Sequence, residues 1–310
     1  MKILFFGTPS FAAVSLKALL EAGHNICGVV TQPDKPVGRK KVLTAPPVKE
    51  VALSAGIPVF QPETLKNEAF YPQLTELQPD CIVTVAYGKL FPAYLLEYPS
   101  MGCINVHGSL LPAYRGAAPI QWAVINGEKE TGITVQKMVL AMDEGDILEQ
   151  VRVPIPEDAT AGDMFERLAE AGAELLLHVL GGLAQGNLQG VPQDHTLATY
   201  APMLTNENTR IDWQKDAVTV ANLVRGAWPS PGAYTFCADK RVRICACKPV
   251  ENAPQGIPGQ VVGYNKVQGF LVCCGDETAV AVTRLQEQGS REMTAVEFAC
   301  GHAWQTMKFE

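Results

Sequence analysis

The pattern of apolar and polar positions at the start of the chain predicts a strand, a helix and a second strand. Residues 2–6 form an apolar run of strand length, and residues 10–22 carry apolar side chains at helical spacing. Gly23 ends this helix, and residues 26–30 form the next apolar run. A strand, a helix and a strand in this order predict a parallel sheet with a right-handed crossover.

The same alternation of strands and helices continues to residue 188. Residues 57–60 are expected at an edge of the sheet, because Pro58 has no N–H to donate to a neighbouring strand. The remaining expected strands are residues 80–85, 103–107, 132–139 and 148–154, and the remaining helices are residues 47–55, 67–77, 118–126 and 160–181. This order is typical of an α/β domain with a Rossmann-like parallel sheet, which we assign to residues 1–188.

After residue 188 the pattern changes. Residues 189–205 contain Pro192 and Pro202 and little periodicity, so we interpret them as a linker. Residues 206–310 are expected to form a second domain, with one helix at 217–226 and a last helix at 292–300. Between these helices five short strands are predicted, at residues 233–238, 241–248, 259–263, 269–274 and 278–285. Evenly spaced short strands favour a small closed β-barrel of the OB-like kind.

Composition supports two globular domains and limits the possible partners. The chain has 310 residues with 47% hydrophobic content, enough for two cores, and no apolar run approaches a membrane span. Its first residues form a strand and not a signal peptide, so we expect a cytoplasmic protein without membrane contact. The nine cysteines show no metal-binding spacing, and we expect no metal. The net charge of −7 gives no general attraction for nucleic acid.

One segment opposes this negative charge. Residues 31–50 contain five basic and two acidic residues, a net charge of +3, and residues 31–41 contain two prolines and a glycine that exclude a regular element. A solvated surface loop is the simpler interpretation. The alternative is a local site for a phosphate-bearing partner, because the cluster follows a strand end on the expected active face. The candidate phosphate-binding residues are four of the five basic residues, Lys35, Arg39, Lys40 and Lys41.

The stretch from residue 103 to residue 119 carries the candidate chemistry. Asn105 and His107 interrupt an apolar strand two positions apart, so both side chains lie on the same side at its carboxyl end. Ligands bind at that place in open α/β sheets. A buried structural histidine before a turn would also fit. Burying both polar groups costs free energy unless each finds a partner, which favours a functional site.

Residues 105–112, Asn-Val-His-Gly-Ser-Leu-Leu-Pro, followed by Tyr-Arg-Gly-Ala-Ala-Pro at 114–119, resemble the signature of the folate-dependent formyltransferases. This resemblance implies a catalytic set of Asn105, His107 and Asp143. It also implies 10-formyltetrahydrofolate as the formyl donor, without a metal. The folate pocket would be lined by Ser109, Leu110, Leu111, Pro112, Tyr87 and Gly88.

Three hypotheses for the function remain, and the first two differ in the formyl acceptor. The first is the α-amino group of methionyl-initiator tRNA, as in translation initiation. The second is a small amine such as an amino sugar or glycinamide ribonucleotide, and the third is a non-enzymatic RNA-binding protein. The third is disfavoured because Asn105, His107 and Asp143 are all present.

The first hypothesis is favoured because the resemblance covers both domains and is closest to the tRNA-formylating branch. It includes Thr-Gln-Pro-Asp-Lys-Pro-x-Gly-Arg at residues 31–39 and Thr-Arg-Ile-Asp-Trp at residues 209–213. It implies that the basic segment and the β-barrel contact charged initiator tRNA. We expect a monomer.

The implied reaction is acyl transfer. A free amine would attack the formyl carbon, and negative charge would develop on the formyl oxygen. Asn105 and His107 would donate to that oxygen, and one such donor is typically worth about 3–4 kcal/mol. Asp143 would orient His107 and help to move the proton of the amine.

Overall fold

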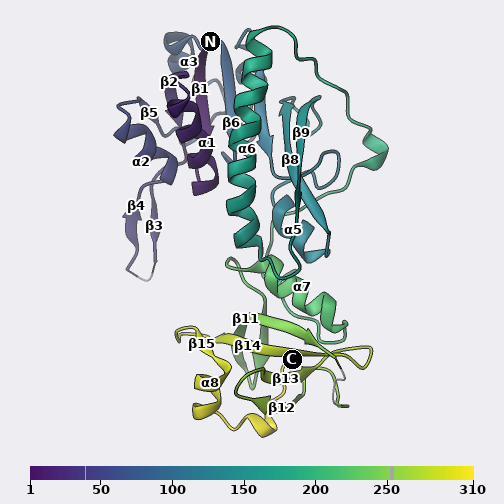
Figure 1. Cartoon of the computed structure of the whole chain (residues 1–310). Helices are drawn as coiled ribbons and strands as arrows, with labels where there is room; N and C mark the ends of the chain where they lie inside the picture. The colour runs from purple at the N-terminus through teal and green to yellow at the C-terminus, as the bar shows by residue number, and fades with distance from the viewer. Residues whose placement is uncertain (39, 252–254) are drawn as a thin grey trace. The chain divides into compact units, whose positions relative to one another are not determined.

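The computed structural model describes residues 1–38, 40–251 and 255–310, which form two compact units (Figure 1). The first unit comprises Met1–Pro119, Glu130–Pro154 and Phe165–Ala201. The second comprises Ile120–Lys129, Ile155–Met164 and Pro202–Glu310. Two short stretches from the middle of the chain therefore belong to the C-terminal unit. The assignment of residues 189–205 as a linker stays a prediction.

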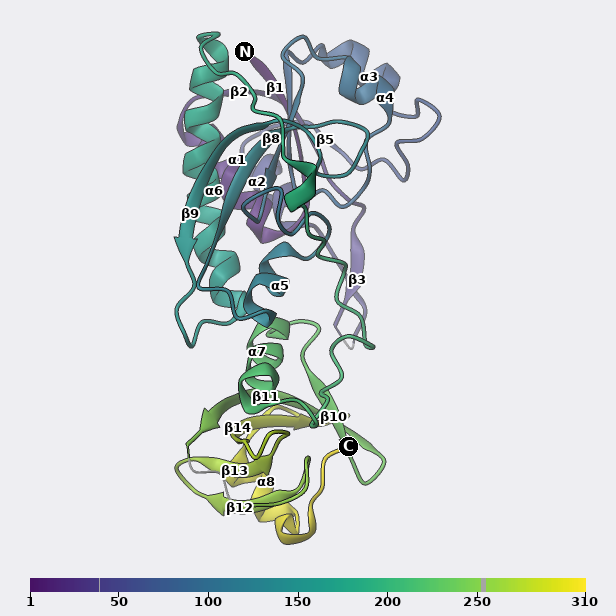
Figure 2. The same cartoon turned by 90° about the vertical axis from the view of Figure 1, so that its right-hand side faces the viewer.

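A seven-stranded sheet with the order β5-β2-β1-β6-β7-β8-β9 forms the centre of the first unit. Figure 2 labels β1, β2, β5, β8 and β9 of this sheet. Its strands are β1 Lys2–Gly7, β2 Asn25–Val30, β5 Val59–Phe60, β6 Cys81–Val85, β7 Cys103–His107, β8 Glu130–Lys137 and β9 Ile147–Pro154. The pairs from β5 to β7 are parallel, which confirms the Rossmann-like prediction and the edge position of β5. The strands β8 and β9 were also predicted, but their antiparallel pairing was not.

The helices of this unit are α1 Ser10–Glu21, α2 Pro47–Ser54, α3 Tyr71–Leu77, α4 Ala93–Glu97 and most of α6 Ala161–Ala184. Helix α6 runs along the sheet (Figure 1). A side chain added at Gly172 of α6 would meet Val106 Cγ1 at 3.1 Å. The glycine therefore lets the helix approach β7, the strand that carries Asn105 and His107.

Aromatic rings fill the core beside β1 and β6. The ring of Phe6 lies 5.1 Å from that of Tyr87 and 4.7 Å from that of Phe91, measured between centroids. All three side chains are buried in one apolar cluster. This packing fixes the turn after β6, which the family resemblance predicts to lie beside the folate.

Residues 31–41 correct one prediction, because they contain a strand. The short strands β3 Lys35–Val37 and β4 Val42–Thr44 pair in an antiparallel hairpin. Pro36 fits there because a two-stranded ribbon leaves backbone N–H positions unpaired along both edges. Lys40 and Lys41 are exposed at its turn. Arg39 lies outside the described residues.

The second unit contains an antiparallel sheet with the order β10-β11-β14-β13-β12, and β15 pairs with β14. The strands are β10 Tyr234–Cys237, β11 Lys240–Val250, β12 Val261–Asn265, β13 Gly269–Cys273, β14 Ala279–Glu287 and β15 Met293–Thr294. The last residues of the chain bond to both edge strands: Val261 N donates to Met307 O (3.1 Å), and Glu310 N donates to Phe236 O (2.9 Å). The C-terminal residues thus close the predicted barrel.

The helices of the second unit are α5 Pro119–Ile125, α7 Ala217–Ala227 and α8 Ala295–Gly301, with short 3₁₀ turns at His195–Leu197 in the first unit and Trp304–Thr306 in the second. Helix α7 is capped at its N-terminus by Asp216, whose carboxylate accepts from the N–H groups of Val218 and Thr219. A bond from the Thr219 hydroxyl is the main cause of the lowered pKa of Asp216. Within the described residues, no helix is both long enough and apolar enough to cross a membrane.

Candidate functional site

Asn105 and His107 lie on β7, next to the line where the parallel part of the sheet meets its antiparallel part. In the register, Asn105 pairs with Thr84 of β6 on one side and with Gln136 of β8 on the other. The side chain of Asn105 is half-buried, and that of His107 is 6% exposed. The period of two predicted from sequence therefore places an amide and an imidazole on one side of the strand end.

The imidazole of His107 is held from both ring nitrogens. Nε2 donates to the carbonyl oxygen of Tyr114 at 2.9 Å, and a carbonyl can only accept, so Nε2 carries a proton. Nδ1 lies 3.6 Å from Oδ1 of Asp143. This separation is longer than a hydrogen bond but close enough for a carboxylate to stabilise a protonated ring.

Asp143 reaches this place from the loop between β8 and β9. Its side chain is only 12% exposed. Oδ1 accepts from Gln136 Nε2 at 3.0 Å, and Oδ2 accepts from the backbone N–H of Gly116 at 2.9 Å. Two donors therefore fix the carboxylate, and its backbone adopts a left-handed φ of 57°. The structure thus places Asp143 beside His107, with Asn105 two residues before His107 on the same strand; the catalytic roles of all three stay predictions.

The loop of residues 109–112 is fixed by Thr134 of β8. Thr134 Oγ1 donates to Ser109 O at 2.6 Å and accepts from Leu111 N at 3.0 Å. The side chains of Ser109 and Leu111 are buried, whereas those of Leu110 and Pro112 are partly exposed. Contact with folate from this loop stays a prediction, and the partly exposed pair is the part of the loop that solvent reaches.

The turn after β6 has a different character. The ring of Tyr87 is buried in the core, and its carbonyl oxygen accepts from Thr8 Oγ1 and from Gln32 Nε2. Gly88 is exposed and has a φ of 85°, which favours glycine. Any contact of this turn with a ligand would therefore come from Gly88 and the backbone, and not from the Tyr87 ring.

The predicted phosphate-binding residues form a separate set. Lys35, Lys40 and Lys41 are exposed on the β3–β4 hairpin. Lys49, which follows the hairpin, is held by Asp34 at 2.8 Å. In the part of the chain that the structure describes, no hydrogen bond or ion pair joins these hairpin lysines to the His107 site.

The predicted site residues did not include three buried side chains with long polar groups. They are Arg115, Gln136 and Gln193, and each is at most 6% exposed. Gln136 could have been found, because it interrupts an apolar strand, as Asn105 and His107 do. Gln193 lay in the predicted linker, where no periodicity marks a buried position.

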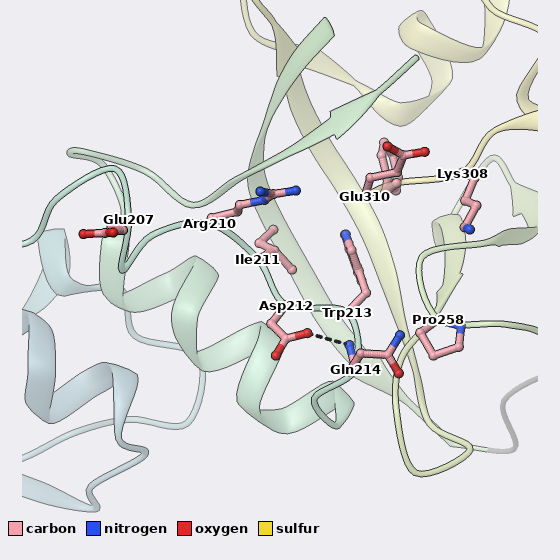
Figure 3. A pocket seen from close by; sticks show the side chains of 10 residues that line it. Glu207, Arg210, Ile211, Asp212, Trp213, Gln214, Pro258, Lys308 and Glu310 are labelled. Atoms are coloured by element: carbon pink, nitrogen blue, oxygen red, sulfur yellow. Dashed lines mark hydrogen bonds between the residues drawn. The ribbon is translucent and has the colours of Figure 1, made fainter. Parts of the chain in front are cut away.

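A cleft in the second unit lies away from these residues (Figure 3). It measures about 500 Å³, and its lining includes Arg210, Asp212, Trp213 and Lys308. The lining contains neither histidine nor cysteine, and its charges are of both signs. This cleft therefore offers no counterpart to the group of polar side chains around His107, which stays the candidate site.

Burial makes two of the cysteines poor candidates for a nucleophile. All nine cysteines are free, and burial raises the pKa of the Cys81 thiol to about 12 and that of the Cys274 thiol to about 12. Such thiols are protonated at neutral pH and are poor nucleophiles. Among the described residues, no group of three or more His, Cys, Asp or Glu side chains is arranged to hold a metal ion.

Comparison with known proteins identifies the same family as the motif of residues 105–119. Residues 1–180 match the family described as formyl transferase, and residues 203–303 match the formyl transferase C-terminal domain. A curated methionyl-tRNA formyltransferase from Halalkalibacterium halodurans is 50% identical over 97% of this chain and 95% of its own length. Another from Ruminiclostridium cellulolyticum is 46% identical over 97% of both chains.

Solved structures share the fold at low identity. HypX from Aquifex aeolicus in complex with tetrahydrofolic acid aligns with a TM-score of 0.68 and 19% identity, over 96% of this chain and 46% of that one. An N-formyltransferase from Helicobacter canadensis with folinic acid and dTDP-3-aminofucose aligns with a TM-score of 0.66 and 18% identity, over 91% of this chain and 98% of that one. With both domains matched and close relatives aligned over nearly the full length, the chain belongs to the formyl transferase family.

Proposed function

We propose that the chain transfers the formyl group of 10-formyltetrahydrofolate to the α-amino group of methionyl-initiator tRNA. The observation that carries the proposal is the ion pair of His107 with Asp143 beside Asn105 at the end of β7, in a chain of which 97% aligns with a methionyl-tRNA formyltransferase. A tRNA acceptor would also explain the positive charge of the β3–β4 hairpin, because a small amine would not need a separate phosphate-binding segment.

The chemistry follows from the charges that the reaction creates. The amine nitrogen forms a bond to the formyl carbon, and the electron pair of the C=O bond moves to oxygen. The side-chain N–H of Asn105 and a protonated Nδ1 of His107 stabilise this oxyanion, each worth about 3 kcal/mol in comparable sites. The formyl C=O then re-forms and the C–N10 bond breaks; N10 of the folate keeps the electron pair of that bond and takes the proton that the amine has given to Asp143.

The amine must lose a proton before it becomes an amide. Asp143 supplies the base, directly or through a water, because its oxygens lie beside His107 Nδ1. His107 Nε2 is already committed to Tyr114 O, so only Nδ1 can exchange a proton with the reacting groups. The carboxylate therefore has two tasks: it holds the charge of His107 and it takes up the proton of the amine.

The folate and the tRNA would approach from different elements. Residues 109–112 and Gly88 line the expected folate pocket at the carboxyl ends of β6 and β7. The lysines of the hairpin and Arg39 would draw phosphates to the first unit, and the barrel would add a second RNA contact. We further propose that the protein acts as a monomer in the cytoplasm, where charged initiator tRNA is found.

The test is a comparison of acceptors. With 10-formyltetrahydrofolate as donor, kcat/KM is measured for methionyl-initiator tRNA, glycinamide ribonucleotide and a nucleotide-linked amino sugar. We expect the charged tRNA to be preferred by at least about 10³-fold, because only it can use both the hairpin and the barrel. A higher kcat/KM for either small amine would overturn the proposed acceptor while leaving formyl transfer intact.

A further inference from the structure

Arg115 and Gln193 form a buried polar pair beside the site, with a role that the reaction described above does not include. Arg115 is 2% exposed and Gln193 is 6% exposed. A guanidinium is costly to bury, so its partners must compensate for the lost water. Gln193 Oε1 accepts from both Nε (3.2 Å) and Nη2 (2.7 Å) of Arg115, and Glu144 Oε1 lies 3.3 Å from Nη1.

The other end of the same glutamine holds the loop of Asp143. Gln193 Nε2 donates to the carbonyl oxygen of Asp143 at 2.8 Å and to that of Gly145 at 2.7 Å. Asp143 has a left-handed φ, a conformation that costs free energy for a residue with a side chain. Two donors on the backbone around it select that conformation, and with it the direction of the carboxylate.

Arg115 connects the same glutamine to the His107 side of the site. The residue before it, Tyr114, accepts from His107 Nε2, and the residue after it, Gly116, donates to Asp143 Oδ2. A shift of Arg115 would therefore move partners of both catalytic side chains. The pair of Arg115 and Gln193 fixes the two loops against each other at the point where they meet.

The segment that supplies Gln193 is part of the sheet domain. Val191 exchanges two backbone hydrogen bonds with Ile147 of β9, at 2.8 and 2.9 Å. Arg115 N donates to Thr199 O, and Ala201 N donates to Arg115 O, both at 2.8 Å. Backbone hydrogen bonds thus join residues 191–201 to β9 at one end and to Arg115 at the other.

We propose that Gln193 and Arg115 are positioning residues of the formyl-transfer site, which hold Asp143 in register with His107. The inference rests on the roles proposed for Asp143 and His107. Neither residue touches the reacting atoms. Their removal should therefore lower the rate of the chemical step and leave the binding of folate nearly unchanged.

The first test compares two replacements of Gln193. Gln193→Met removes all its hydrogen bonds at similar volume, whereas Gln193→Glu keeps the acceptor for Arg115 and removes the donors to Asp143 and Gly145. Both should lower kcat about 10- to 100-fold, with KM for the folate within about twofold, since small misplacements of a catalytic group cost rates of this order. The matched control Gln73→Met changes a half-buried glutamine of α3 and should leave kcat within about twofold.

Thermal melting of each variant shows whether it is folded, and a parental kcat in a folded Gln193→Met would overturn the inference. A parental kcat in Gln193→Glu would also overturn it, because the donors to the Asp143 loop would then be dispensable. These two variants avoid replacing Arg115, whose loss from the interior could unfold the protein.

The second test is a double-mutant cycle with Asp143→Ala. If Gln193 acts through Asp143, Gln193→Met should cost less than about twofold in kcat once Asp143 is gone. A merely structural role predicts the same 10- to 100-fold loss in both backgrounds and would contradict the inference. If Asp143→Ala alone keeps the parental kcat, the proposed role of Asp143 fails, which is a different outcome.

Discussion

The replacement of Asp143 by asparagine is the sharpest change that the site offers. The two side chains have the same shape, but the amide replaces one carboxylate oxygen with an NH₂ group. In the parent, the two oxygens accept from different donors, Gln136 Nε2 and Gly116 N. An asparagine has only one acceptor oxygen, so one of these donors must face another donor.

The cost can be worked from these contacts. A buried donor left without its partner costs about 1–3 kcal/mol. The variant also loses the negative charge that lies 3.6 Å from His107 Nδ1, and with it the base for the amine. Removing one such stabilising group from a transition state costs about 3–4 kcal/mol in comparable enzymes. At about 1.4 kcal/mol for each factor of ten, we expect kcat to fall about 10²- to 10³-fold.

The assay is single-turnover formylation of charged tRNA at saturating folate, together with folate affinity and thermal melting. Asp146→Asn, the same change three residues along the loop, is the matched control and should leave kcat within about twofold. A folded Asp143→Asn with a kcat within about threefold of the parent would show that the carboxylate neither holds the charge of His107 nor accepts the proton.

Other predictions concern separate parts of the chain. Arg39→Ala should raise KM for charged tRNA and leave folate affinity unchanged. The slope of log tRNA affinity against log salt concentration should fall by about one, and an unchanged slope would show that the residue contacts no phosphate. Burial raises the pKa of Tyr87 from 10.0 to about 12, so the folded state keeps a proton that the unfolded state releases. The free energy of unfolding, measured with urea, should therefore fall by about 2 kcal/mol more in the parent than in Tyr87→Phe between pH 10 and pH 12. The same pH dependence in both proteins would refute this. A fragment ending at residue 205 should bind folate but melt at lower temperature, because it lacks the α7 residue Gly226 that packs against Ile125 of α5; an unchanged melting temperature would contradict that contribution.

The sheet of the first unit could be predicted because its strands are nearly continuous apolar runs bounded by glycine or proline. The sequence reasoning failed where local signals compete. Helix α3 begins later than predicted because Asn67 and Glu68 adopt left-handed φ values of 53° and 55°. The β3–β4 hairpin was excluded on its prolines, although two strands pairing only with each other tolerate them. The helix α4 and the strand β15 are too short to show a period.

The site also contains residues that could be predicted from the sequence and residues that could not. Asn105 and His107 could be found from sequence because two polar residues at a period of two interrupt an apolar strand. Asp143 needed the family resemblance, since nothing in its loop marks the left-handed turn that brings it back to β7. Gln193 is 50 positions from Asp143 in the chain, and its bonds to that loop depend on a tertiary arrangement that no local pattern encodes.

The central claim is tested most directly by the product itself. The parent and His107→Ala are incubated with 10-formyltetrahydrofolate and methionyl-initiator tRNA, the ester is hydrolysed, and the released amino acid is identified by mass. The account predicts N-formylmethionine in one equivalent per tRNA with the parent, and a rate at least about 10²-fold lower with His107→Ala. Unmodified methionine with the folded parent, or equal rates for both proteins, would contradict it.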